Sequence, residues 1–302
     1  MPHFASAAAL LASLAAPPAE ATVPAGTVKK DPASTGSTEL GGSGQFAAAG
    51  TKVEENKDAT ELNFSFGGIF NTGNARSIAV TGLGKFLLRR GIHQFTSSAA
   101  GNYGRAALGV RDNPETTDVN EGRVAITVGN VQGQLRYDAF FHKNFSGFLM
   151  GTARHDRFQG LDLRLNVDPG IAMYAIEQEK HKLWFEAGYD FQYDVRRDEA
   201  LEVASDLGER PSKIAVNHAA RLFAGYTNNL SEYVTFDTGF EYLQSFLKAK
   251  RFRFNWISAL NVQLANRFSL ATTFTLRYEN EPIQGVVKLD TITSLLLSIR
   301  VI

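Results

Sequence analysis

The densest group of reactive side chains in this sequence lies between residues 154 and 164, in the segment RHDRFQGLDLR. Its charged members are Arg154, Asp156, Arg157, Asp162 and Arg164, with His155 among them. Guanidinium groups bind anions through paired donors, but they also form salt-bridge networks with nearby carboxylates. The segment therefore predicts either an anion-binding rim or catalytic patch, or a network of ion pairs that ties two neighbouring strands together.

A second set of charges lies on the polar sides of alternating segments. Its members are Glu186 and Asp190, followed further along the chain by Arg251, Arg253, Arg267 and Arg277. If these segments are strands of a barrel, the charges either fill the lumen or line a pore and set its selectivity. Acidic residues face these arginines in comparable number and neutralise them, which favours a filled lumen over an anion channel.

Residue types that support catalysis or metal binding show no useful spacing. His218 shares its side of an alternating segment with Ile214 and Leu222, and no serine nucleophile motif accompanies it, so we predict a lipid-facing or interface histidine. Six scattered histidines provide no metal-binding pattern. Gly82 and Gly84 are strand glycines without a following helix, unlike a phosphate loop. We therefore expect a protein that is not an enzyme and has no cofactor or metal.

Composition excludes further classes of function. The chain has 302 residues, with 31 basic and 31 acidic side chains, so no charge excess indicates binding to nucleic acid. It contains no cysteine, which excludes disulfides, thiolate metal sites and cysteine nucleophiles.

Apolar and polar residues alternate with a period of two from residue 61 to the end, which predicts strands. The twelve predicted strands are Glu61–Phe70, Ser77–Leu88, His93–Tyr103, Arg123–Phe141, Gly147–Phe158, Leu161–Ile176, Leu183–Asp194, Ile214–Thr227, Tyr233–Phe246, Phe252–Leu264, Phe268–Tyr278 and Lys288–Ile302. Pro169-Gly170 inside the sixth predicts an interrupted ladder and a bulge.

The length and amphipathicity of these segments predict an all-β, antiparallel transmembrane barrel of about 12 strands. A soluble β-sandwich is the alternative, but its strands are usually about five or six residues long. The last segment, KLDTITSLLLSIRVI, has one apolar face and would be an aggregation-prone edge unless it paired with the first strand and closed the barrel.

The connections between the predicted strands sort by length. Residues 104–118 and 196–212 read as long charged loops, whereas the connections at 89–91, 142–146, 177–181, 228–231 and 265–266 are short. If the first strand runs outward, both long loops are extracellular and the short connections are periplasmic, as are both ends of the barrel.

The amino-terminal part of the chain is organised differently. Residues 4–16 form an apolar run of the length of a signal-peptide core, and Ala19-Glu20-Ala21 predicts cleavage after residue 21, so 1–21 is predicted to be a signal peptide. A disordered alanine-rich tail is the alternative. Residues 22–60 contain few bulky apolar side chains and predict a disordered periplasmic linker, followed by the barrel over 61–302.

The segment Arg154–Arg164 resembles a recurring stretch of a family of Gram-negative outer-membrane proteins, the DUF481 or YdiY-like family, often labelled salt-induced outer membrane protein. The family's R-D-R-F-x-G-L-D-x-R pattern is matched by Asp156, Arg157, Phe158, Gly160, Leu161, Asp162 and Arg164. The turn Asn71–Asn74 and the ending Asp290–Thr293 followed by Leu295–Val301 are also similar to that family. The resemblance covers about residues 60 to 302.

This resemblance implies a barrel in the outer membrane of a Gram-negative bacterium, in a family without an established biochemical activity. The expected partners are outer-membrane lipid, lipopolysaccharide and, through Leu289–Ile302, the barrel assembly machinery. The favoured function is structural or linked to envelope and salt stress, with a lumen largely filled by charged side chains. The alternative is a narrow, porin-like passive channel for small solutes or anions.

Overall fold

The computed structural model describes residues 58–71, 77–108, 123–178, 180–208 and 210–301. The predicted signal peptide, nearly all of the predicted linker and the turn at Asn71–Asn74 lie outside these residues, apart from Asn71. The described elements are β1 (Ala59–Asn71), β2 (Ser77–Arg90), β3 (His93–Leu108), β4 (Arg123–His142), β5 (Phe145–Asp156), β6 (Leu161–Glu177), β7 (His181–Arg196), α2 (Asp198–Asp206), β8 (Ile214–Asn229), β9 (Val234–Ser245), β10 (Phe252–Ala265), β11 (Phe268–Glu279) and β12 (Leu289–Arg300).

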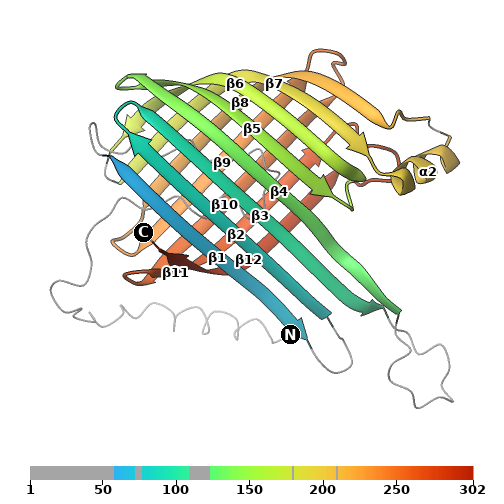
Figure 1. Ribbon diagram of the computed structural model, residues 1–302, viewed down its shortest axis with the longest axis horizontal. Helices are drawn as coiled ribbons and strands as arrows, with labels where there is room; N and C mark the ends of the chain where they lie inside the picture. The colour runs from blue at the N-terminus through green and yellow to red at the C-terminus, as the bar shows by residue number, and fades with distance from the viewer. Residues whose placement is uncertain (1–57, 72–76, 109–122, 179, 209, 302) are drawn as a thin grey trace, which may run out of the picture. The chain divides into compact units, whose positions relative to one another are not determined.

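The twelve strands form a closed antiparallel barrel in which each strand pairs with its neighbours in sequence (Figure 1). Strands β1 and β12 close it, with Asn63 opposite Arg300 and Phe66 opposite Leu297. The backbone N–H of Val301 donates to the carbonyl of Leu62 at 2.8 Å. This pairing covers the last four residues of β12, Leu297–Arg300, and pairing of a strand edge protects an apolar strand from edge-to-edge aggregation. The predicted fold class is confirmed.

The alternation of side chains follows directly from the pleat of each strand. In β7, Trp184, Glu186 and Asp190 are buried and point into the barrel, whereas Phe185 and Tyr189 are exposed on its outside. The same phase holds in β10, where Arg253 and Asn255 are buried and Trp256 is exposed. The faces predicted for these two strands are confirmed.

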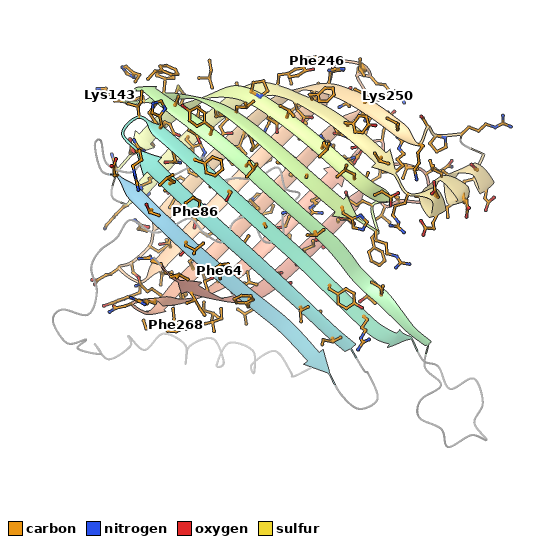
Figure 2. The ribbon with its side chains drawn as sticks, in the orientation of Figure 1. Phe64, Phe86, Lys143, Phe246, Lys250 and Phe268 are labelled. Carbon is orange, nitrogen blue, oxygen red and sulfur yellow. The ribbon has the colours of Figure 1, made fainter. Side chains whose placement is uncertain are left out.

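The outer face of the barrel is apolar and rich in aromatic side chains. Figure 2 shows Phe64, Phe246 and Phe268 on the outside, and each is at least 39% exposed. In a soluble protein such a surface would be a site of association, whereas a barrel surrounded by lipid requires it. Neighbouring strands also pair aromatic rings there, as with Phe240 and Phe254 at 4.3 Å between centroids.

The two ends of the barrel differ. One end, called here the helix end, carries the connections 157–160, 197–213, 246–251 and 280–288. The opposite end carries the short connections between β2 and β3 and between β4 and β5, together with the first residue of β1 and the last of β12. Lys143 and Lys250 mark the opposite end and the helix end in Figure 2.

The segment 196–212 contains the helix α2 rather than a continuous loop, so that prediction is wrong. The helix has nine residues, and Asp198 and Glu199 in its first turn favour its positive N-terminal end. Gly208, just beyond its last turn, has a φ of 89°, which favours glycine. No helix in the described part of the chain is long and apolar enough to cross a membrane.

Several strand boundaries and irregularities differ from prediction. Strand β3 continues to Leu108, so the predicted loop at 104–118 begins later, and its remainder lies outside the described residues. The predicted bulge at Pro169-Gly170 is wrong: pairing with β7 is interrupted there, but the register shifts lie at Leu161/Leu163 and Tyr174/Ile176. Proline lacks the N–H that a ladder needs, which explains an interruption without an extra residue.

Candidate functional site in the lumen and its mouth

A chain of ion pairs lies inside the barrel between β4 and β9. Arg136 donates from Nη1 to Glu186 Oε1 at 2.9 Å, and Arg221 donates from Nη1 to Glu186 Oε2 at 2.7 Å. Asp138 accepts from Arg136 at one end, and Glu241 accepts from Arg221 Nε at 2.7 Å at the other. These five residues are called the central ionic chain.

All five side chains of the central ionic chain are at most 1% exposed. Buried charges are tolerated only when they are paired and hydrogen-bonded, and here each carboxylate accepts from a guanidinium. Arg136 belongs to β4 and Glu186 to β7, three strands away, so their pair crosses part of the lumen. The lumen at this level is therefore filled by its own side chains.

Apolar side chains fill the space beside the central ionic chain. This aromatic plug consists of Phe140, Phe148, Met150, Ala172, Tyr174, Trp184, Phe223 and Ile257. The guanidinium of Arg136 stacks over the ring of Phe148 at 4.2 Å from its centroid. Glycines make room for these rings, because a Cβ at Gly225 would lie 2.1 Å from the Trp184 ring and one at Gly170 would lie 2.4 Å from Phe148.

A second group of ion pairs lies closer to the helix end. Arg164 binds Asp194 through two bonds, from Nε at 2.7 Å and from Nη2 at 2.8 Å. Arg253 reaches Asp190 at 3.3 Å, although Asp190 is on β7 and Arg253 is on β10. Paired donors on one carboxylate fix the position of both side chains as well as neutralising them.

The cluster at residues 154–164 divides between the inside and the outside of the barrel. Arg154 and Asp156 point inward and form an ion pair at 2.5 Å, and Arg164 also points inward. Asp156 also accepts from the backbone N–H groups of Phe158 and Gln159, each at 3.1 Å, and so ends β5. This turn explains why Phe158, predicted in a strand, lies outside β5.

The remaining charges of this cluster lie outside the lumen and hold α2. Asp162 pairs with Arg197 at 3.1 Å and with Lys213 at 3.3 Å. Hydrogen bonding to Asp198 raises the pKa of Lys213. Hydrogen bonds from its own backbone N–H and from Arg197 lower the pKa of Glu199. Arg157 is exposed beside this group.

Side chains from opposite walls of the barrel contact one another near the helix end. Arg277 Nη1 lies 3.6 Å from Asp156 Oδ2, and their strands, β11 and β5, are six apart in a ring of twelve. Gln159 donates to Asp290 at 2.8 Å from the β5–β6 turn to β12. Side chains thus span the full width of the lumen at this level.

A polar cavity of about 50 Å³ opens at the helix end, above these contacts. This cavity is called the vestibule, and its charged lining consists of Arg154, Arg164, Asp194, Arg196, Arg251, Arg253, Arg277, Glu279, Glu281, Lys288 and Asp290. Seven basic side chains thus face four carboxylates, a formal excess of three positive charges. Asp156 and Asp190 lie behind them and reduce the excess to one.

The structure brings together most of the predicted charges, but not all of them. Arg251, Arg253 and Arg277 meet in the vestibule, whereas Arg267 is exposed in the β10–β11 turn at the opposite end. The predicted grouping of Arg267 with the other three arginines is therefore not supported. Arg267 alternates in the same phase as these arginines, but it lies a strand length away from them. His218 lies on the outer face, as predicted, and its ring makes tilted contacts with Tyr189 and Phe191.

The central ionic chain contains residues that the sequence did not single out. Arg136 and Asp138 share the inward side of β4 with Gln132 and Gln134, and this polar run at a period of two was the available signal. Arg221 and Glu241 are isolated charges on otherwise mixed strands, and only the barrel shows that they meet. Among the described residues, no group of three or more histidines, cysteines and carboxylates is placed to hold a metal ion.

A closed, twelve-stranded antiparallel barrel with an apolar outer face and a charged interior defines an outer-membrane-type β-barrel protein. The chain belongs to the family described as "Protein of unknown function, DUF481", whose model matches residues 64–300. The resemblance seen in the residue 154–164 segment is thereby confirmed at the level of that family. No curated protein sequence matches the chain.

Solved structures with a similar fold include barrels of the outer membrane. The NanC porin has a TM-score of 0.46 and 10% identity, covering 80% of this chain and 98% of that one. The COG4313 outer membrane channel from Pseudomonas putida F1 has a TM-score of 0.44 and 12% identity, covering 80% and 95%. The translocator domain of the autotransporter NalP from Neisseria meningitidis has a TM-score of 0.36 and 9% identity, covering 80% and 86%. At these identities the likeness concerns the fold class alone.

Proposed function

We propose that this protein is a structural barrel of the bacterial outer membrane whose lumen is closed by its own side chains. One observation carries the proposal: the central ionic chain and the aromatic plug occupy the same level of the lumen with fully buried groups. An open aqueous pore would leave lumen side chains in contact with water. The proposed role is maintenance of the envelope, including its response to salt stress, without catalysis or a cofactor.

The outer surface supports the membrane location. Exposed apolar side chains continue around the barrel, and the proposed partners are outer-membrane lipid and lipopolysaccharide. An outward-facing hollow of about 600 Å³ over β1–β5 is lined by Phe66, Val80 and Tyr103, and its lining also includes Arg157 and Arg197. This combination suits an acyl chain beside an anionic headgroup.

Residues Leu289–Ile302, which include β12, are the proposed recognition segment for the barrel assembly machinery.

A narrow channel for small solutes or anions is the second candidate. The basic excess of the vestibule favours it, because clefts lined by one sign of charge concentrate ions of the other sign. Against it, Asp156, Arg277 and the residues around them connect opposite walls below the vestibule.

Planar-bilayer recording of the purified protein separates the two functions. A closed barrel is expected to give no steady conductance steps at either polarity. Ohmic steps whose ion selectivity changes in the Arg253→Glu variant would establish a channel and overturn the closed barrel. Arg253 is a suitable probe because it is buried at the vestibule floor and bonded to Asp190.

A further inference from the structure

The vestibule contains cations that the protein itself does not neutralise. Arg251 lines the cavity, and its side chain makes no hydrogen bond or ion pair with any described residue. The side chain of Arg196 donates to the backbone carbonyl of Ser212, at 3.1 Å. Burial lowers the pKa of Arg251, in the β9–β10 connection, and the neighbouring Arg253 lowers it further while Glu279 raises it. Arg251 is thus a charge held close to the lumen without a counter-ion of its own.

The guanidinium group of Arg154, behind Arg251, is also short of acceptors. Asp156 forms ion pairs with both Arg154 and Arg277, at 2.5 and 3.6 Å. The Nε of Arg154 is buried and has no hydrogen-bond acceptor within the described structure. A buried donor without an acceptor destabilises the protein, and it does so more strongly when it is charged. An anion entering from the vestibule would supply the missing acceptors and the missing charge.

We infer that the vestibule binds a small oxyanion, a phosphate or carboxylate group carried by a soluble molecule, at the helix end of the barrel. Guanidinium groups present parallel N–H donors that match the oxygen spacing of phosphates and carboxylates. The cavity of about 50 Å³ admits one such group but not a bulky ligand in full. Arg251 and Arg154 are assigned as ligand-binding residues, with Arg277 as the third cation of the site.

Calorimetric titration of the purified protein with inorganic phosphate tests this site, in a zwitterionic detergent and at low ionic strength. Wild-type protein is expected to bind phosphate saturably at one site. Arg251→Gln is expected to weaken binding about tenfold or more, because hydrogen bonds to a charged group contribute about 1.5–3 kcal/mol each. Arg267→Gln is the matched control, since it removes the same charge from an exposed position at the opposite end.

Two outcomes would overturn the site. The first is that the wild type shows no saturable binding. The second is that Arg251→Gln and Arg267→Gln weaken binding equally, because equal weakening would indicate non-specific attraction. Repeating the titration in nanodiscs with and without phosphatidylglycerol separates the ligand sources: unchanged affinity supports a soluble ligand, and competition by that lipid overturns this assignment. Heat-modifiable migration of each variant confirms that it is folded. The result is independent of conductance, so the oxyanion site and the closed lumen can fail separately.

Discussion

Arg277 on β11 and Asp156 on β5 face each other across the lumen, with 3.6 Å between Nη1 and Oδ2, although their strands are half a circumference apart. Each residue is less than 10% exposed. A contact between opposite walls is possible only where long side chains fill the whole interior. This contact lies between the vestibule and the charged lumen below, so Asp156 takes part in the ion pairs of both.

Asp156→Asn is expected to destabilise the barrel by about 3–5 kcal/mol, the usual effect of breaking a buried ion pair. Two guanidinium groups lose their shared counter-ion, and the turn that ends β5 loses part of its acceptor. The temperature at which the folded gel band disappears measures the effect. Asp162→Asn is the matched control, because Asp162 is partly exposed and its ion pairs contribute about 0–1 kcal/mol. An equal shift in both variants would contradict a structural role for the cross-lumen contact.

Gly225→Ala is expected to destabilise the barrel, because a Cβ there would lie 2.1 Å from the ring of Trp184. Overpacking of this kind usually costs about 1–3 kcal/mol. Gly151→Ala is the control: no atom lies within 4 Å of the added Cβ. Urea unfolding in detergent compares the two variants, and equal midpoints would show that Trp184 is free to move away.

Removing the aromatic plug should open the lumen. The double variant Phe148→Ala, Trp184→Ala is expected to show conductance steps in a planar bilayer that are absent from the wild type. Leu149→Ala, Phe185→Ala is the matched control, because these neighbours point outward and are 53% and 39% exposed. A folded plug variant that stays silent would mean that the ionic network alone closes the barrel.

The helix end is predicted to face the outside of the cell. An epitope inserted after Asp206, the last residue of α2, is expected to be labelled on intact cells. An epitope inserted after Lys143, in the β4–β5 turn, is expected to be labelled only after permeabilisation. The reverse pattern would show that the barrel is inserted in the opposite direction.

The attachment of α2 is expected to depend on pH on both sides of neutrality. Because the pKa of Lys213 is raised in the folded protein, its bonds stabilise the attachment of α2 below the unfolded pKa. This stabilisation is lost as pH rises through the folded pKa. Because the pKa of Glu199 is lowered, its hydrogen bonds stabilise the attachment of α2 above the unfolded pKa. This stabilisation is lost as pH falls through the folded pKa. A spin label at Glu202→Cys reports the mobility of α2, since the chain has no other cysteine. Lys213→Ala should abolish the alkaline change only; an unaltered alkaline change would rule out Lys213 as the anchor.

The period-two pattern determined the twelve strands, their order and the inward faces of β7 and β10. This succeeds because a strand's pleat places alternate side chains on opposite faces regardless of its neighbours. The closing role of β12 also followed from the sequence, since its apolar outward side requires lipid and its edge requires a partner. Leu296, an apolar exception on its polar side, packs inside the barrel against Ala271.

Which charges meet is visible only in the tertiary structure. Arg136 and Glu186 are three strands apart, and Arg277 and Asp156 are six apart, so their pairing depends on barrel closure and strand register rather than on local sequence. The same holds for Arg267, whose polar phase matches that of Arg277 but whose position lies at the other end of the barrel. Residue types and alternation therefore specified a barrel with a charged interior, and the tertiary structure showed that long side chains pack across that interior.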